Sequence, residues 1–394
     1  MISSEKALAL VLSHSSKGFR TREISLSDAL DYVLAADVIS LIDMPPFRQS
    51  AMDGYALKIG ETNSYKILGE VQAGGVNSLQ LNKGEAVRIF TGAPVPDTAD
   101  AVVIQEKVRL KADTILVEDP LQLMMNIRPQ GEQIKKAAVA LAKGTSIKGT
   151  HIGFLAGLGI TRIEVAEKPA IAVVVTGNEL VPAGQDLAHG KIYESNSAML
   201  IAVLKELGYS NTTVISIKDH FESTKEALRE TIEKNDVVIV TGGVSVGDYD
   251  FVGKALNAIG VHEIFHKVNQ KPGKPMYFGK KEHTAIFGLP GNPAAALTCF
   301  YVYVYPLLKK YQGAEDAHLL TILLPLLNDY TVIGGDRAQF LKAKISGTGV
   351  EILTGQSSAM LSAFGTANAF VFVPEDRIKL EKGEIVKTIL LPIK

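Results

Sequence analysis

Apolar residues between positions 169 and 312 follow two alternating patterns. Unbroken apolar runs such as AIAVVVT and DVVIVT are typical of strands that are buried on both faces of a parallel sheet. Stretches with helical spacing follow these runs, among them SNSAMLIAVLKELG, in which Gly208 stands where a helix would end in a left-handed residue. This alternation of strand and helix predicts a three-layer α/β domain built on a parallel sheet.

The flanking segments have different patterns. Between residues 44 and 136, short runs such as YKILGEV are separated by Gly, Pro and Asp turns, which predicts an inserted β module. Residues 313–394 contain similar runs, including AFVFVP, and are expected to form a C-terminal β barrel. Helical spacing in 1–43 and 137–168 predicts a helical linking region. The predicted fold class is therefore α/β multidomain.

Several helix starts can also be predicted. A helix over residues 25–40 is expected behind Ser27 or Asp28 as its N-cap. Thr150 is expected to cap a second helix, and Ser223 should form a capping box with the glutamate three positions on.

Composition narrows the class of protein. A chain of 394 residues exceeds one ordinary core, so about two to four domains are expected. The formal net charge of −1 disfavours a nucleic-acid partner, which would require a basic field. The single Cys299 excludes a disulfide framework and favours a reducing compartment. The apolar run LTCFYVYVYPLL is too short to cross a bilayer, and the first residues lack the features of a signal peptide. A cytoplasmic protein without a membrane partner is expected.

Polar stretches follow several of the predicted strands. They are TGNEL (176–180), TGGVSVGDYD (241–250) and GLPGNP (288–293). Because the carboxyl ends of parallel strands meet at one edge of the sheet, these stretches are expected to surround one crevice.

Residues in these stretches have both a functional and a structural interpretation. Gly242 and Gly243 would let backbone N–H groups approach an anionic or planar ligand, or they would simply make a tight turn. Asp248 and Asp250 could bind a metal, although capping of the next helix is the favoured interpretation of Asp250 on the residues alone. Glu179 is a further candidate metal ligand, with capping of a turn as the alternative.

A basic turn, HKVNQKPGKP (266–275), is more informative. It places Lys267, Lys271 and Lys274 beside a Pro-Gly turn, where their ammonium groups would hold an oxyanion or a phosphate. A solvated basic loop is the alternative, and the spacing is not that of a P-loop. In the β module, Asp53 precedes a glycine and Thr91 follows a strand, so both could be ordinary turn residues.

Taken in order along the chain, six motifs resemble one family. They are PPFRQSAMDGYAL, GEAVRIFTGAPVPDTADAVVIQE, TGNEL, TGGVSVGDYDF, KPGKP and GLPGNP. This set is similar to the MoeA family of molybdopterin molybdenumtransferases, which is related to the C-terminal part of gephyrin, and the resemblance spans nearly the whole chain. It implies a Mg²⁺-dependent transferase that inserts molybdate into adenylylated molybdopterin and releases AMP in the last step of molybdenum cofactor biosynthesis. It further implies an α/β domain of the molybdopterin-binding type and a homodimer formed through the helical region.

The resemblance also implies roles for individual residues. Those implied to be catalytic are Asp53, Thr91, Lys267 and Lys271. Those implied to bind substrate are Gly242, Gly243, Ser245, Lys274, Pro290, Gly291, Asn292 and Pro293, and the implied metal ligands are Glu179, Asp248 and Asp250. Relatives carry an acid where Gln133 stands here, so one carboxylate role lacks a matching residue unless Glu132 supplies it.

The resemblance leaves two alternative functions, and the additional β domains and the presence of Asp53 and Lys271 argue against them. One is a molybdopterin adenylyltransferase, whose fold resembles residues 169–312 only. The other is a non-enzymatic cofactor-binding or scaffold protein. A molybdopterin adenylyltransferase and apo-molybdoenzymes are candidate partners. The motifs do not decide between molybdate and tungstate, nor the order of AMP release and metal insertion.

Overall fold

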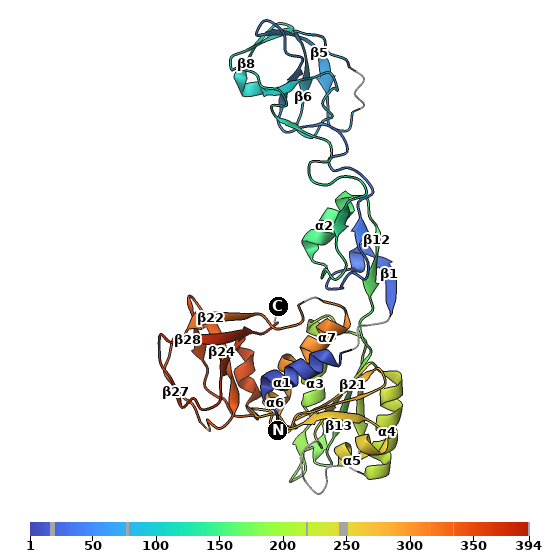
Figure 1. Cartoon of the computed structure of the whole chain (residues 1–394), viewed down its shortest axis with the longest axis vertical. Coiled ribbons are helices and arrows are strands. Elements are labelled where there is room, and N and C mark those ends of the chain that lie inside the picture. Colours follow the sequence, from blue (N-terminus) through green and yellow to red (C-terminus); the bar gives the residue numbers. More distant parts are fainter. Residues whose placement is uncertain are drawn as a thin grey trace. The chain divides into compact units, whose positions relative to one another are not determined.

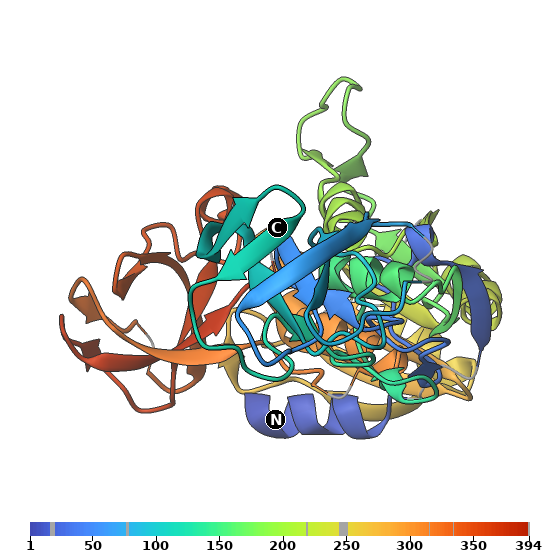
Figure 2. The ribbon, with the colours of Figure 1, turned by 90° about the horizontal axis from the view of Figure 1, so that it is seen from above.

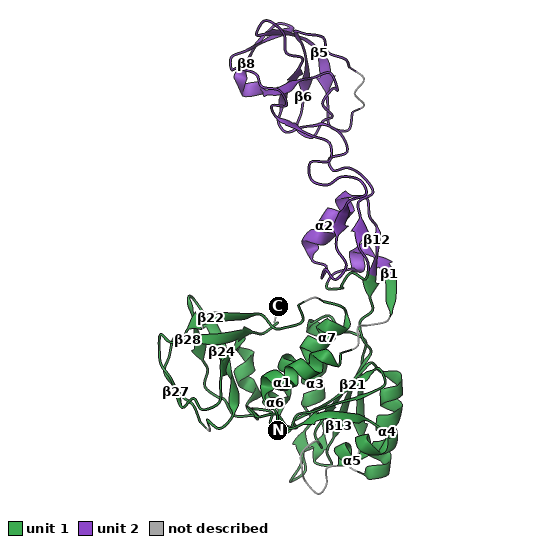
Figure 3. Cartoon of the chain, viewed as in Figure 1, with its two compact units in different colours: residues 1–22, 31–35, 165–394 green, residues 23–30, 36–164 purple. Residues whose placement is uncertain are grey.

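The computed structural model describes residues 1–15, 20–75, 79–217, 220–243, 251–314, 316–333 and 335–392. These residues divide into two compact units (Figure 3). Unit 1 comprises residues 1–22, 31–35 and 165–394, and unit 2 comprises residues 23–30 and 36–164. The division passes through β1 (Thr21–Ser25) and β12 (Arg162–Ala166), which pair with each other.

The α/β part of unit 1 is a sheet with the strand order β16-β13-β17-β21-β20-β18. Its strands are β16 (Thr212–Ile217), β13 (Ile171–Thr176), β17 (Val237–Thr241), β21 (Thr284–Leu289), β20 (Tyr277–Lys281) and β18 (His262–His266). The first four are parallel, whereas β20 and β18 are antiparallel additions at one edge. The parallel sheet predicted from the unbroken apolar runs is confirmed.

Helices cover both faces of this sheet (Figure 1). Ile171, Val173 and Val175 of β13 pack against α3 (Asn196–Glu206) and the helical stretch of α6 (Pro293–Cys299), η3 (Phe300–Val304) and α7 (Tyr305–Tyr311). Ala172 and Val174 face the other way, against α4 (Phe221–Lys234) and α5 (Phe251–Ala258). Successive residues of a strand point to opposite faces, so one apolar run supports both layers.

The N-terminal helix α1 (Ser4–Ser13) belongs to the same unit and is the dark blue helix at the N-terminus in Figure 2. Ser3 caps it, since its hydroxyl accepts a hydrogen bond from the Lys6 N–H at 3.2 Å. Ala7 and Val11 are buried against the core that includes η3 and α7. Of the helices expected in the first forty residues, the structure thus contains α1.

The C-terminal part of unit 1 is a barrel of antiparallel strands. They are β22 (Thr321–Pro325), β28 (Ile385–Leu390), β26 (Ala369–Val373), β24 (Ala338–Ser346) and β25 (Gly349–Ile352) in order of pairing, with β23 (Tyr330–Thr331), β27 (Lys379–Leu380) and η4 (Leu361–Gly365) outside this path. A bridge between Leu326 and Val350 brings the chain after β22 back to β25 and closes the barrel. The predicted β barrel is confirmed.

A short strand links the barrel to the α/β part. β19 (Gln270–Lys271) pairs in parallel with β24, Gln270 opposite Ala338 and Lys271 opposite Gln339. The basic turn predicted from the sequence is therefore hydrogen-bonded to the barrel sheet.

Unit 2 contains the inserted β module, a sheet with the order β7-β4-β6-β5-β9-β8. These strands are β4 (Gly54–Leu57), β5 (Ser64–Val71), β6 (Glu85–Ile89), β7 (Ala101–Ile104), β8 (Val108–Lys111) and β9 (Thr114–Val117), with η2 (Gln105–Lys107) between β7 and β8. The shorter elements of the unit are η1 (Leu26–Asp28), β2 (Val38–Ile39), β3 (Gln49–Ser50), β10 (Ile127–Arg128), β11 (Val139–Leu141) and α2 (Gly149–Gly157).

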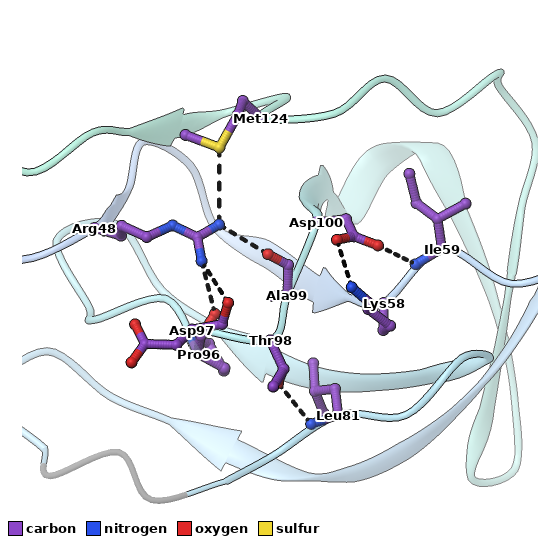
Figure 4. Close-up of polar contacts among 10 residues, drawn as sticks. All are labelled: Arg48, Lys58, Ile59, Leu81, Pro96, Asp97, Thr98, Ala99, Asp100 and Met124. Carbon is purple, nitrogen blue, oxygen red and sulfur yellow. Dashed lines mark hydrogen bonds and ion pairs between the residues drawn. The ribbon is translucent and has the colours of Figure 1, made fainter.

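Arg48 fixes the loop before β7 (Figure 4). Its guanidinium donates hydrogen bonds to the carbonyls of Pro96 and Asp97, and to that of Ala99 at 2.8 Å. At the end of the same loop, Asp100 pairs with the Lys58 ammonium at 2.9 Å. The Arg48 guanidinium thus ties three residues of the loop together through their backbone carbonyls.

The helix predicted over residues 25–40 is wrong. The one helical element there is the short η1, which is followed by Asp31 in the left-handed region at φ 62° and later by the strand β2. Val33 and Leu34 are buried because this segment is extended beside residues 165–166: the Val33 carbonyl accepts from the Ala166 N–H, and Leu34 bridges Val165. The linking region is consequently mixed rather than purely helical.

Two predicted caps are also wrong, and one helix end is confirmed. The helix α2 begins at Gly149 behind Lys148, so Thr150 lies inside it. The helix α4 begins at Phe221 behind His220, so Ser223 is one turn in and its hydroxyl donates to the His220 carbonyl. Gly208 does follow the end of α3 with φ 85°. None of the described helices has the length and apolar content needed to pass through a bilayer.

Candidate functional site

A pocket of about 920 Å³ opens in unit 1 at the carboxyl ends of β13, β17 and β21. Its lining also includes residues 179–180 and 192–194, the start of α3, the lysine turn 271–275, residues 290–293 and 295, Arg337 and the loop 356–359. Because β13, β17 and β21 are parallel neighbours, their ends meet at one edge of the sheet. The crevice expected around these strand ends is therefore present.

Glycines allow the strand ends to approach each other closely. Gly242 and Gly243 have φ values of 86° and 60°, which side chains rarely adopt. A β-carbon on Gly242 would lie 2.6 Å from the Thr176 carbonyl oxygen, and one on Gly243 would lie 2.7 Å from the Thr176 hydroxyl oxygen. Both positions thus require glycine, and Gly242 lines the pocket.

Asn196 connects two of the strand ends. Its Nδ2 donates to the Thr241 hydroxyl at 2.7 Å and to the Gly291 carbonyl at 2.7 Å. Its Oδ1 is buried and has no hydrogen-bond partner among the described residues, and the same holds for Oγ1 of Thr176. Unpaired buried polar atoms are costly, so these pocket residues are suited to a ligand that supplies donors or a cation.

The basic turn contributes two of its lysines to the pocket. Lys271, on β19, and the exposed Lys274 both line it. The Lys271 ammonium donates to the Ile333 carbonyl at 2.9 Å, so it is held at the edge of the barrel. Lys267 lies outside the described lining of the pocket and has a left-handed φ of 72°. The structure therefore brings together Lys271 and Lys274 but not Lys267.

The segment after β21 takes its expected place. Pro290, Gly291, Asn292 and Pro293 all line the pocket, and α6 begins at Pro293 with Asn292 as its N-cap residue. The Asn292 side chain donates to the Ser358 hydroxyl at 2.9 Å, which ties this segment to the barrel.

The barrel supplies pocket residues that the sequence reasoning missed. Arg337, Ser357 and Ser358 line the pocket together with the lysines. The Arg337 Nε lies 3.6 Å from Asp336 and has no hydrogen-bond partner among the described residues. Guanidinium, ammonium and hydroxyl groups around one space are suited to bind an oxyanion. Arg337 lies in the segment GDRAQF and the two serines lie in GQSS, and neither segment matches a motif that predicted the site. Asn196 was missed because it was interpreted as an ordinary residue of an amphipathic helix.

Of the predicted metal ligands, only Glu179 lies among the described residues. Glu179 is exposed and lines the pocket. Ser245, Asp248 and Asp250 lie outside the described residues. Within the described ranges, no cluster of three or more His, Cys, Asp or Glu side chains could hold a metal ion.

The oxygen donors that are described nevertheless fit Mg²⁺ in kind. Glu179 provides a carboxylate, and Thr176 and Asn196 provide oxygens without partners among the described residues. Mg²⁺ prefers oxygen ligands and is usually bound through one or two carboxylates. Glu194 is a weaker candidate because both of its carboxylate oxygens accept hydrogen bonds from Ser197.

In unit 2 the structure joins Asp53 and Thr91. The Oδ1 of Asp53 accepts hydrogen bonds from the Thr91 N–H and from the Thr91 hydroxyl, both at 2.7 Å. These two bonds, the backbone one first, lower the pKa of the exposed Asp53 carboxyl, with a smaller contribution from Arg88. Asp53 is consequently kept ionised and oriented. Glu132 and Gln133 of the same unit are both exposed.

Comparisons with known proteins cover nearly the whole chain. The family descriptions that match are "MoeA N-terminal region (domain I and II)" over residues 2–159, "Probable molybdopterin binding domain" over 172–310, and "MoeA C-terminal region (domain IV)" over 327–391.

Individual relatives agree with these matches. The chain is 32% identical to the molybdopterin molybdenumtransferase of Staphylococcus epidermidis over 378 residues, which is 93% of this chain and 90% of the relative. Identity to the Staphylococcus aureus protein of the same name is also 32%, over 379 residues, with the same coverage of both chains. The crystal structure of the molybdopterin biosynthesis MoeA protein from Pyrococcus horikoshii OT3 matches with a TM-score of 0.87 and 29% identity, over 99% of this chain and 100% of the other. The chain therefore belongs to the MoeA family of molybdopterin molybdenumtransferases.

Proposed function

We propose that this protein inserts molybdate into adenylylated molybdopterin and releases AMP, completing the molybdenum cofactor. The observation that carries the proposal is the pocket in which Lys271, Lys274 and Arg337 lie around the ends of parallel strands. Such strand ends are where open α/β sheets bind their ligands, and the cations match the two negatively charged reactants.

The pocket residues would bind different parts of the two reactants. Lys271, Lys274 and Arg337 would hold molybdate, with the Ser357 and Ser358 hydroxyls as additional donors. The close approach at Gly242 would let the substrate lie against the backbone, as phosphate groups do at other glycine-rich turns. Lys267 keeps its predicted catalytic role only as a proposal, since it lies outside the described lining.

Magnesium is the cofactor that we propose. Glu179 would hold it together with the oxygens of Thr176 and Asn196. Asp248 and Asp250 would be further ligands, a role that is predicted from the sequence alone. When bound, Mg²⁺ would neutralise the negative charge of the substrate's diphosphate group. A Glu179→Gln variant should then need more Mg²⁺ for half-maximal activity, and an unchanged Mg²⁺ requirement would remove Glu179 from the metal site.

The decisive experiment supplies the purified chain with adenylylated molybdopterin, Mg²⁺ and molybdate. AMP and active cofactor are both measured, and they should appear together and only with molybdate. A non-enzymatic scaffold would bind the nucleotide without either product. An adenylyltransferase would instead make adenylylated molybdopterin from molybdopterin and ATP.

Two lysine variants, one in the pocket and one outside it, test the proposed site. Lys271→Ala should lower molybdate-dependent product by roughly tenfold or more, because an oxyanion loses a charge-assisted contact. Lys205→Ala, at an exposed position of α3, is the matched control and should leave the rate unchanged. If both variants retain full activity with the same dependence on molybdate, Lys271 does not bind the anion.

The proposal also includes the oligomeric state and the cellular location of the protein. We expect a cytoplasmic homodimer, in contact with a molybdopterin adenylyltransferase that supplies the substrate and with apo-molybdoenzymes that take the product. Sedimentation equilibrium of the pure chain tests the dimer, since a mass near 42.3 kDa at all concentrations would contradict it.

A further inference from the structure

A lysine is buried in the wall of the barrel, behind the oxyanion pocket. Lys342 of β24 is only 3% exposed. Its ammonium donates to the carbonyls of Ser357 and Met360 at 3.2 and 3.1 Å, and it lies 5.7 Å from the centre of the Phe364 ring. Burial lowers the pKa of this lysine. An apolar side chain would fill the same space without the cost of desolvating a charge, so the lysine has to be explained by what it binds.

The backbone of the same residue binds the same loop. The Gln356 side chain accepts from the Lys342 N–H at 2.9 Å and donates to the Lys342 carbonyl at 2.8 Å. It also donates to the Leu353 carbonyl at 2.8 Å. Residues 353–360 are thus tied to one position of β24 through both its main chain and its side chain.

This loop carries barrel residues into the pocket. Residues 356–359 line it, and Ser358 contacts the opposite wall through Asn292 and through the Ala295 N–H, which donates to the Ser358 carbonyl at 3.1 Å. In a trans peptide the N–H of one residue points away from the carbonyl of the residue before it. Because the Ser357 carbonyl is directed at Lys342, the Ser358 N–H is directed away from Lys342.

We propose that Lys342 is a positioning residue of the oxyanion pocket: by binding the carbonyls of Ser357 and Met360, it turns the donor side of the 356–359 loop toward the anion. The proposal rests on the proposed function, since it assigns Lys342 to molybdate binding. Lys342 acts through the loop and does not line the pocket itself.

The test compares three full-length variants. Lys342→Met keeps an unbranched side chain, one atom shorter and without the charge, and Lys342→Arg restores a cation with several donors. Lys344→Met is the matched control, because Lys344 is exposed two residues further along the same strand. Each variant is measured for amide hydrogen exchange of residues 353–361, for molybdate affinity by calorimetry, and for KM and kcat with molybdate.

For Lys342→Met we expect faster exchange in residues 353–361, with exchange of β13 and β17 unchanged. Molybdate Kd and KM should rise by roughly tenfold, because the anion loses one charge-assisted contact with the displaced loop. The value of kcat should change far less. Lys342→Arg should recover most of the affinity, and Lys344→Met should match the wild type. If Lys342→Met does not fold, Gln356→Met releases the same loop and should change exchange and KM in the same direction.

Two results would overturn the inference. Unchanged exchange in the loop would show that Lys342 does not fix it, and faster exchange with unchanged molybdate affinity would show a structural role only. Failure of the proposed function looks different. In that case the wild type neither binds nor consumes molybdate, the oxyanion role of Lys342 falls with it, and the exchange experiment still decides whether Lys342 fixes the loop.

Discussion

Replacing Gly242 by alanine should destabilise unit 1 and damage the pocket. The φ of 86° at this residue costs an L-amino acid about 1–2 kcal/mol. The new β-carbon would also lie 2.6 Å from the Thr176 carbonyl oxygen, a backbone atom that cannot turn aside as a side chain would. Such overpacking costs about 1–3 kcal/mol, so the total is about 2–5 kcal/mol. Thr176 belongs to β13, which is paired on both edges, and this leaves little room for relief.

Scanning calorimetry measures this effect. For a domain of this size a loss of 1 kcal/mol lowers Tm by about 2–4 °C, so the transition of unit 1 should fall by about 4–20 °C. The control is Gly253→Ala in α5, where a β-carbon would meet no atom of the described residues within 4 Å and φ is ordinary. Alanine favours a helix interior over glycine by up to about 1 kcal/mol, so this variant should be slightly more stable than the wild type. Equal Tm values for Gly242→Ala and the wild type would refute the close-approach argument.

Further predictions concern buried and ionised groups. Asn196→Ala removes two hydrogen bonds and leaves the Thr241 and Gly291 partners unpaired, so it should cost about 2–4 kcal/mol in unfolding and weaken nucleotide binding, as followed by calorimetry. Because the pKa of Asp53 is lowered in the folded chain, this carboxylate contributes stability above its unfolded pKa of about 3.9, and that stability is lost as pH falls through the folded pKa. Asp53→Asn should therefore be less stable than the wild type at pH 7, and the difference should shrink as the pH is lowered, as followed by thermal unfolding. Burial raises the pKa of the Cys299 thiol, so iodoacetamide at neutral pH should modify it only after unfolding; rapid labelling of the native chain would contradict its burial.

The central sheet could be predicted from the sequence because the hydrophobic pattern of each strand is contained in a few consecutive residues. β13, β17 and β21 are apolar throughout, as strands covered on both faces must be, and their ends are rich in glycine and proline. Parallel pairing then forces those ends to one edge, so the crevice followed from the strand assignments. The roles of Glu179 and of residues 244–250 remain predictions.

Features that depend on distant pairing could not be predicted in this way. Val33 and Leu34 have helical spacing but are buried because they lie beside residues 165–166, more than a hundred positions away in sequence. Arg337 and Ser358 have no local motif and reach the pocket only because the barrel packs beside the α/β sheet. The significance of Asn196 likewise comes from its contacts with Thr241 and Gly291, which only the folded chain provides.

The strand β19 explains why the barrel belongs to the site. Lys271 is paired with Gln339 of β24, and its ammonium is bound by the Ile333 carbonyl, so both its backbone and its charge are placed by the barrel. An isolated α/β domain would keep the strand ends of the crevice but would lose Arg337, Ser358 and the partners that hold Lys271. A single-domain adenylyltransferase would not need these groups, whereas the binding of a second, separate oxyanion does. Two of the three cations of the proposed reaction, Lys271 and Arg337, are therefore fixed or supplied by the barrel.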